Sequence, residues 1–429
     1  MVGGEAVVGD VVGDVVRESA QAGRLVVWEE SARDGAQAKT LMPAELRVRV
    51  ACEQGRMFGG DGPRHVVFAA GFPAVCGEEF EAVRRVAVEA EGAVSVAAVC
   101  RGTERDVRQA LASVRGTAHA RIMVVVPASE AMAQVMVHRG AREAFEDAVA
   151  LVKQARDLDD RIAVDLCLAD AARADHGLVA AGAHAMTGAG AGTVILADTV
   201  GAQLPAETAA MFARVRARTG PEVVLGCHLH NDLGLGLANT LEALRSGVRV
   251  ASTAWLGLAE RSGLPATEQL LFLLAHDPDR AGPLVGAEDG GRLWWTQPDL
   301  TRLPGIARSV SAGVGLPLTV TTPIVGTGVG TISTGTPFVH PELFQPFDPQ
   351  ARLGITPTVV LTHLASARVV TAVAARLGRD LDRAQARTAM AWVKSQAYRT
   401  GRAVVDEQSF AAYLDGLAAA AGAPERGAP

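Results

Sequence analysis

The chain has 429 residues, of which 49% are hydrophobic and 21% are charged, a composition typical of a folded protein with a large core. Its net charge of −6 argues against a nucleic-acid partner or an anionic membrane surface, because both attract concentrated Lys and Arg. The five cysteines form no Cys-x-x-Cys pair, which argues against disulfides or a thiolate zinc site and indicates a reducing compartment, the cytoplasm. The longest uncharged stretch, 177–197, consists mostly of small residues, so no membrane span is expected.

Short apolar runs rich in Val, Ile and Ala alternate along the chain with segments of helical spacing. The helical segments include 78–91, 105–114, 142–158 and 205–219, and the eight apolar runs are 25–28, 65–70, 94–99, 122–126, 162–166, 193–196, 223–226 and 248–253. This alternation is typical of a parallel sheet buried on both faces, and eight repeats close a barrel. The pattern predicts an α/β fold of the (β/α)8 TIM-barrel type. An open doubly wound sheet is less favoured, because no G-x-G-x-x-G follows the first run.

The composition changes after the eighth run. Residues 282–335 are rich in Gly, Pro and Thr, which predicts a linker or a lid over the barrel mouth, and helical periodicity returns after residue 358 in 381–398 and 406–419. We expect four parts: an N-terminal leader at 1–22, the barrel at 23–281, the linker or lid at 282–357 and a small helical domain at 358–429.

A candidate metal site lies at the predicted strand ends. His228 and His230 occupy the segment CHLHND at the end of the seventh run, and residues two apart on a strand point to the same side. Asp34, beside Arg33, follows the first run, and barrel active sites lie at the C-terminal ends of strands. Two imidazoles and one carboxylate suit Mn, Co, Zn, Fe or Mg with open positions for a substrate. The alternative is two polar strand-end histidines and a local Arg33–Asp34 ion pair.

Several segments occur in the order found in a known family. The chain resembles the isopropylmalate, homocitrate and citramalate synthases, a branch of the DRE-TIM metallolyase superfamily, over nearly its whole length. The matching segments are SARDGAQ at 31–37, GFPAV at 71–75, ADTVG at 197–201, HLHNDLGLGLANT at 228–240 and GLAERSG at 257–263, with PIVG at 323–326 and PFDP at 346–349 beyond the barrel.

The resemblance implies an acyltransferase that condenses acetyl-CoA with a 2-oxo acid to give a 2-substituted malate. It makes Asp34, His228 and His230 ligands of a divalent metal (Mn, Co, Mg or Zn), which chelates the keto acid and polarises its carbonyl. It also implies that the active chain is a homodimer. The chain ends where the leucine-binding regulatory domain of isopropylmalate synthase would begin, so feedback inhibition by leucine is not expected.

Four further residues receive roles from the resemblance. Arg33 would stabilise oxyanion charge, and Thr199 would bind the substrate carboxylate. Glu260, assisted by a histidine beyond the barrel, would move the proton of the acetyl methyl group or of the alkoxide. His340 in STGTPFVHPE is our choice for that histidine, with His363 or a water as alternatives. Without the resemblance, Thr199 would be a strand-end cap and Glu260 a surface acid.

The chain also departs from the family pattern. Acidic or amide side chains of the family are replaced at Ala36, Ala69, Ala169 and Leu264, and Asp165 stands where homocitrate synthases have an arginine. These changes predict an altered acceptor pocket and a role in specialised metabolism such as antibiotic biosynthesis.

An acidic acceptor is favoured, such as phosphonopyruvate, phosphinopyruvate or oxaloacetate. Its distal anionic group would bind Arg173, or else Arg101 or Arg139, unless these form helix-start ion pairs. The alternatives are a carbon–carbon lyase of the hydroxymethylglutaryl-CoA lyase or aldolase type and a barrel that has lost turnover.

Overall fold

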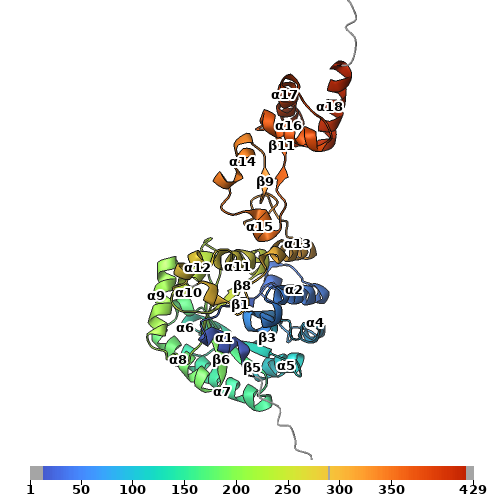
Figure 1. Cartoon of the computed structure of the whole chain (residues 1–429). Helices are drawn as coiled ribbons and strands as arrows, with labels where there is room; N and C mark the ends of the chain where they lie inside the picture. Colours follow the sequence, from blue (N-terminus) through green and yellow to red (C-terminus); the bar gives the residue numbers. More distant parts are fainter. Residues whose placement is uncertain (1–12, 288–289, 422–429) are drawn as a thin grey trace, which may run out of the picture. The chain divides into compact units, whose positions relative to one another are not determined.

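Eight parallel strands close into a barrel in sequence order, with β1 paired to both β2 and β8. The computed structural model describes residues 13–287 and 290–421 (Figure 1). The strands are β1 (Val26–Glu29), β2 (Val66–Gly71), β3 (Ser95–Arg101), β4 (Ala120–Pro127), β5 (Ala163–Ala169), β6 (Ala191–Asp198), β7 (Leu225–Leu229) and β8 (Val250–Thr253). Each predicted apolar run overlaps one strand, so the predicted TIM barrel is confirmed.

Helices between the strands surround the barrel (Figure 1). Their first turns use ordinary capping chemistry: Thr103 and Asp175 accept backbone N–H groups, and Pro205 occupies the first position of α9. The helices of this layer are α2 (Ala44–Arg56), α3 (Gly62–His65), α4 (Gly77–Glu89), α5 (Glu104–Val114), α6 (Glu130–Met136), α7 (Ala141–Leu158), α8 (His176–Gly188), α9 (Pro205–Arg216), α10 (Gly236–Arg245), α11 (Thr267–Ala275) and α12 (Pro278–Leu284).

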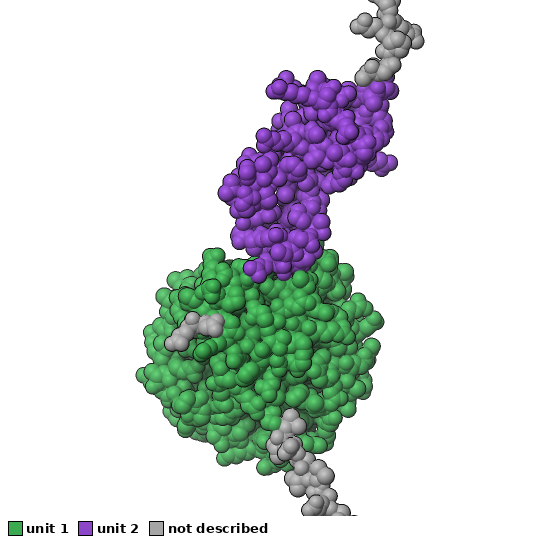
Figure 2. All heavy atoms as spheres, viewed as in Figure 1, with its two compact units in different colours: residues 1–317 green, residues 318–429 purple. Residues whose placement is uncertain are grey.

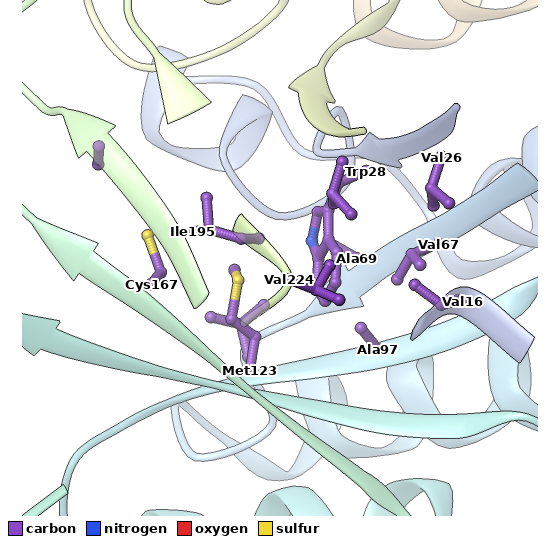
Figure 3. Packing of buried hydrophobic residues seen from close by; sticks show 13 residues of the cluster. Val16, Val26, Trp28, Val67, Ala69, Ala97, Met123, Cys167, Ile195 and Val224 are labelled. Atoms are coloured by element: carbon purple, nitrogen blue, oxygen red, sulfur yellow. The ribbon is translucent and has the colours of Figure 1, made fainter. Parts of the chain in front are cut away.

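The barrel interior is a packed core around Trp28 (Figure 3). Trp28 is fully buried in one cluster with Val224 and the small residues Ala69 and Ala97. Ala69, where the family pattern has an acid, is therefore part of this core. A carboxylate at that position would be buried among apolar side chains, which is costly without a partner.

A buried ion-pair network lies at the amino-terminal ends of the strands. The Arg121 guanidinium donates to both carboxylate oxygens of Asp165, at 2.9 and 2.7 Å, and also to Asp14, the N-cap of α1 (Val15–Gln21). Thr193 donates its hydroxyl to Asp165 at 2.7 Å. Asp165 therefore binds Arg121 near the start of β5, at the opposite end from the candidate metal ligands.

The described part of the expected leader is helix α1, whose Val16 belongs to the barrel core. Residues 1–12 of that predicted leader lie outside the described residues.

The chain divides into two units, residues 1–317 and residues 318–429 (Figure 2). The sequence interpretation ended the barrel at residue 281 and placed a linker or lid at 282–357, and the division between the two units falls inside that predicted linker. Helix α13 (Leu303–Val314) extends the first unit, because it buries Leu303, Ile306 and Val310 and packs against α2. Those apolar residues have helical spacing that the surrounding Gly and Pro residues obscured.

The second unit contains two short two-stranded sheets and a helical core. Val369, Val373, Phe410 and Leu414 are among the buried residues of that core. Its elements are β9 (Thr331–Ile332) paired with β10 (Thr358–Val359), β11 (Leu361–Thr362) paired with β12 (Val404–Val405), and helices α14 (Gly335–Val339), α15 (Pro349–Leu353), α16 (Ala367–Arg376), α17 (Arg383–Thr400) and α18 (Glu407–Ala421). In the described part of the chain, every helix is too short or too polar to span a membrane.

Replacing Arg121 by Leu should lower the free energy of unfolding by about 3–5 kcal/mol, because it leaves the buried Asp165 carboxylate without its cation. Urea unfolding followed by circular dichroism measures this change. Arg108→Leu, which removes an exposed pair with Glu104, serves as the control and should change stability little. Equal effects of the two substitutions would contradict the structural role of Arg121.

Glu268 on α11 is fully buried and accepts the Leu256 N–H at 3.0 Å, and burial raises its pKa to about 7. Between pH 4.5 and 7 the folded chain holds this proton while the unfolded chain releases it, so stability falls as pH rises through that window. Glu268→Gln should remove this loss, which is about 3 kcal/mol between pH 4.5 and 8. Urea midpoints across that range measure the slope. Any offset caused by the amide itself is independent of pH, and an unchanged slope would contradict the prediction.

Candidate metal centre and active site

The three predicted metal ligands lie together at the carboxyl-terminal ends of the strands. One ligand atom from each of Asp34, His228 and His230 lies within 4.8 Å of the others. The two imidazole Nε2 atoms are 3.2 Å apart, and His228 Nε2 is 3.5 Å from Asp34 Oδ2. All three side chains are buried. Because β1 and β7 are not neighbours in the barrel, only its closure brings their ends to a common site.

This donor set fits a divalent cation. Two imidazole nitrogens and one carboxylate oxygen suit the transition ions and Mg, and three protein ligands leave positions for a substrate. The Nε2 atoms converge on one another, whereas the Nδ1 atoms of His228 and His230 have no hydrogen-bond partner among the described residues. The residues present are therefore suited to hold such an ion through Nε2.

The surroundings shift the pKa values of the three candidate ligands in different directions. Burial raises the pKa of Asp34, but His228 and Arg33 outweigh this effect and hold the pKa well below its usual range. Burial lowers the pKa of His228, but Asp34 and Glu30 raise it to about 9. Burial and the neighbouring His228 lower the pKa of His230 to about 4. Without a metal, His228 is therefore an imidazolium near neutral pH, and a cation bound at Nε2 would displace the proton of that nitrogen.

Arg33 lies directly beside the cluster. Its Nη1 is 2.7 Å from Asp34 Oδ2 and 3.9 Å from Glu30 Oε2. Burial lowers the pKa of the guanidinium, whereas Glu30 and Asp34 raise it, and the net shift is upward. Arg33 is therefore a fixed cation in a mostly buried site, as an oxyanion-stabilising residue must be.

Glu260 lies on the loop between β8 and α11. Its backbone N–H donates to Asp34 Oδ1 at 2.8 Å, while its half-exposed carboxylate lies 3.1 Å from Arg261 Nη1. Arg261 in turn donates to Asp232 and to the Thr199 carbonyl. The loop turns sharply at Gly263, which has a φ of 91° and where a Cβ would meet the Gly257 carbonyl oxygen at 2.0 Å.

Thr199 follows β6 and is linked to Arg173 through Asp170. The Thr199 hydroxyl accepts the Asp170 N–H at 2.9 Å, which leaves its own hydrogen free to donate. Asp170 binds Nε and Nη2 of Arg173 at 2.7 and 2.9 Å. Arg101 and Arg139 also form ion pairs, with Asp106 and Asp147. All three arginines thus form the local ion pairs that were the alternative to anion binding.

His340 lies in the second unit and is exposed, with Nδ1 3.2 Å from Glu342 Oε1. His363, its alternative, packs edge-on against Tyr398 with ring centres 5.7 Å apart. Neither histidine is placed relative to the barrel, so the choice of His340 stays a prediction.

The sequence interpretation did not identify Glu30, which lies between Arg33 and His228. The sequence feature that could have indicated Glu30 is the pair of consecutive acids, Glu29 and Glu30, at the end of the first apolar run. Neighbouring residues on a strand point to opposite faces, so the pattern does not show which acid reaches the site.

Fold and site together define a (β/α)8 barrel with a candidate divalent-metal centre at the ends of β1 and β7. The HMGL-like family model matches residues 31–310, which include all three candidate ligands, so the chain belongs to the HMGL-like family. This match and the relatives described next confirm the resemblance predicted from the sequence.

The curated relatives include 2-isopropylmalate synthases. The chain is 30% identical over 288 residues to the one from Syntrophus aciditrophicus, covering 66% of this chain and 54% of that protein. It is 33% identical over 312 residues to the one from Neisseria gonorrhoeae, covering 72% and 49%. The chain thus spans about half the length of these relatives. Among solved structures, hydroxymethylglutaryl-CoA lyase from Pseudomonas aeruginosa shares the fold, with a TM-score of 0.54 and 21% identity over 68% of this chain and 93% of that chain.

Removing either kind of ligand should abolish tight metal binding. We expect Asp34→Asn and His230→Ala to weaken Mn binding by on the order of 100-fold or more, because each removes one of three protein donors. Isothermal titration of the chelator-treated chain with Mn measures the affinity. His184→Ala removes an exposed histidine paired with Glu222 and is the matched control. Wild-type affinity in both ligand variants would exclude this cluster as the metal centre.

Proposed function

We propose that this chain joins the acetyl group of acetyl-CoA to the keto carbon of a 2-oxo acid, which gives a 2-substituted malate and free CoA. The observation that supports this most directly is the buried cluster of Asp34, His228 and His230 with Arg33 beside it. The names of the curated relatives favour the same reaction class, an acyltransferase that converts the acyl group to an alkyl group on transfer.

The barrel residues would bind and polarise the keto acid. A divalent metal, when bound, acts as a Lewis acid on the keto carbonyl. Asp34 and the two histidines would hold it, and Arg33 would stabilise the negative charge that develops on the keto oxygen. The free hydrogen of the Thr199 hydroxyl would donate to the substrate carboxylate.

Glu260 is the proposed proton-transfer residue. Its backbone bond to Asp34 fixes the residue next to the metal ligands, and its carboxylate is half exposed and therefore accessible to a substrate. It would remove a proton from the acetyl methyl group, or return one to the alkoxide, with His340 of the second unit assisting. Hydrolysis of the thioester then releases CoA as a thiol and makes the reaction effectively irreversible.

For the acceptor we propose an acidic 2-oxo acid, such as phosphonopyruvate, phosphinopyruvate or oxaloacetate, in a pathway of specialised metabolism. Arg173 is the proposed partner of the distal anionic group. Because Asp170 occupies its Nε and Nη2, that group would use Nη1 or compete with Asp170. A cytoplasmic homodimer is part of the same proposal.

Thiol release from acetyl-CoA tests the reaction. With Mn present and pyruvate, 2-oxoisovalerate, 2-oxoglutarate, oxaloacetate and phosphonopyruvate as acceptors, we expect release with an acidic acceptor and none in Asp34→Asn.

We further expect Arg173→Ala to raise KM for that acceptor more than it lowers kcat, because it removes binding energy rather than a proton-transfer group.

Two other outcomes of the thiol-release assay would change the proposal. Release with 2-oxoisovalerate alone would keep the condensation and exclude the acidic acceptor. No release from the metal-loaded chain with any acceptor of this panel would contradict the condensation with these acceptors. It would favour a carbon–carbon lyase, which cleavage of hydroxymethylglutaryl-CoA would then test.

A further inference from the structure

Glu30 is a buried acid that the roles assigned above do not use. It is the first residue after β1, its side chain is 0% exposed, and neither carboxylate oxygen has a hydrogen-bond partner in the described part of the chain. An ionised carboxylate in such a place is unfavourable unless a positive charge or a donor lies close by. Its nearest charged neighbours therefore indicate its role.

Those neighbours are a candidate metal ligand and the site cation. Glu30 Oε1 is 3.6 Å from His228 Nδ1, and Oε2 is 3.9 Å from Arg33 Nη1. His228 Nδ1 likewise has no hydrogen-bond partner among the described residues. The other nitrogen of the same ring, Nε2, faces Asp34 and His230. The carboxylate thus lies on the outer side of His228, opposite the candidate metal position.

The backbone of Glu30 is hydrogen-bonded to β8 and to the two residues Arg33 and Asp34. Its N–H donates to the Thr253 carbonyl at the end of β8, at 2.8 Å. Its carbonyl accepts the N–H groups of Arg33 and Asp34, at 3.0 and 2.7 Å. The backbone of Glu30 is therefore held in the turn that also presents Arg33 and Asp34.

We propose that Glu30 is a positioning residue of the candidate metal centre. With a cation bound, its carboxylate would accept the Nδ1–H of His228, which would keep Nε2 without a proton and directed at the cation, and it would hold Arg33 beside Asp34. A carboxylate behind a ligating histidine fixes the ring and increases its basicity, and loss of such a partner commonly weakens metal binding 10–100-fold. The present separations are ion-pair distances that a small rotation of either side chain would convert to a hydrogen bond. This inference rests on the metal centre of the proposed function.

The neighbouring Glu29 shows that burial alone does not produce this arrangement. Its Oε1 accepts the N–H of Ser31 and the N–H of Trp255, so that carboxylate connects β1 to the loop after β8. Two consecutive buried acids thus have different partners, and only Glu30 lies against the ligand set.

Cobalt binding to the full chain tests the proposal without depending on turnover. After chelator treatment, Co affinity is measured by isothermal titration and ligand geometry by the visible absorption of bound Co. We expect Glu30→Gln, which keeps the side-chain size but removes the charge, to weaken Co binding 10–100-fold and to alter the absorption spectrum. Glu268→Gln, which removes a fully buried carboxylate on α11 instead, should keep wild-type affinity and spectrum.

The outcomes separate this inference from the proposed function. Wild-type affinity and spectrum in Glu30→Gln, together with loss of binding in Asp34→Asn, would overturn the role of Glu30 alone. No Co binding by the wild-type chain would overturn the metal centre and the role of Glu30 with it. If Glu30→Gln does not fold, Glu30→Asp provides the same comparison, because its shorter carboxylate keeps the charge but should lie farther from His228 and give an intermediate affinity.

Discussion

The rest of the site depends on the contacts of the Asp34 carboxylate. Its Oδ1 accepts the backbone N–H of Glu260, while its Oδ2 contacts Arg33 at 2.7 Å and His228 at 3.5 Å. One side chain after β1 is thereby bonded to the end of β7 and to the loop after β8. These contacts bring the candidate metal ligands, the Arg33 guanidinium and the proposed proton-transfer residue together, so the loss of Asp34 would affect all of them at once.

The two ends of the barrel have different tasks. At the amino-terminal ends, Arg121 is buried between two carboxylates and joins α1 to β4 and β5. At the carboxyl-terminal ends, the Glu30 carboxylate and the Nδ1 atoms of His228 and His230 have no hydrogen-bond partner among residues 13–287 and 290–421. Buried polar groups without hydrogen-bond partners are unfavourable for folding, so this end of the barrel is less stabilised than the end that holds Arg121. This contrast agrees with the usual division of barrels into a stability end and a catalytic end.

The departures from the family pattern are of several physical kinds. Ala69 is part of the barrel core, and Leu264 is buried with Ala254 and Ala259. Ala169 closes β5 and is also buried, whereas Ala36 is exposed on the turn after β1. The four altered positions therefore differ in their surroundings, and three of them are buried apolar residues. The acid that lies behind His228, Glu30, is at none of these four positions, and its Oε1 is 3.6 Å from His228 Nδ1.

Local patterns in the sequence were sufficient to predict the barrel and to select the three side chains that the structure brings together as candidate metal ligands. The apolar runs predicted the strands because buried parallel strands are continuous in hydrophobicity, and His228 and His230 could be paired because residues two apart share one face. Asp34 could be added because strand ends meet at one mouth.

Only the tertiary structure decided the remaining contacts. Arg121 and Asp165 lie 44 residues apart on neighbouring strands, and no local pattern indicates their pairing. Glu29 and Glu30 are chemically alike and adjacent, and only the closed barrel shows which of them faces His228. These contacts depend on side-chain direction and on the register of distant strands, which a one-dimensional pattern does not contain.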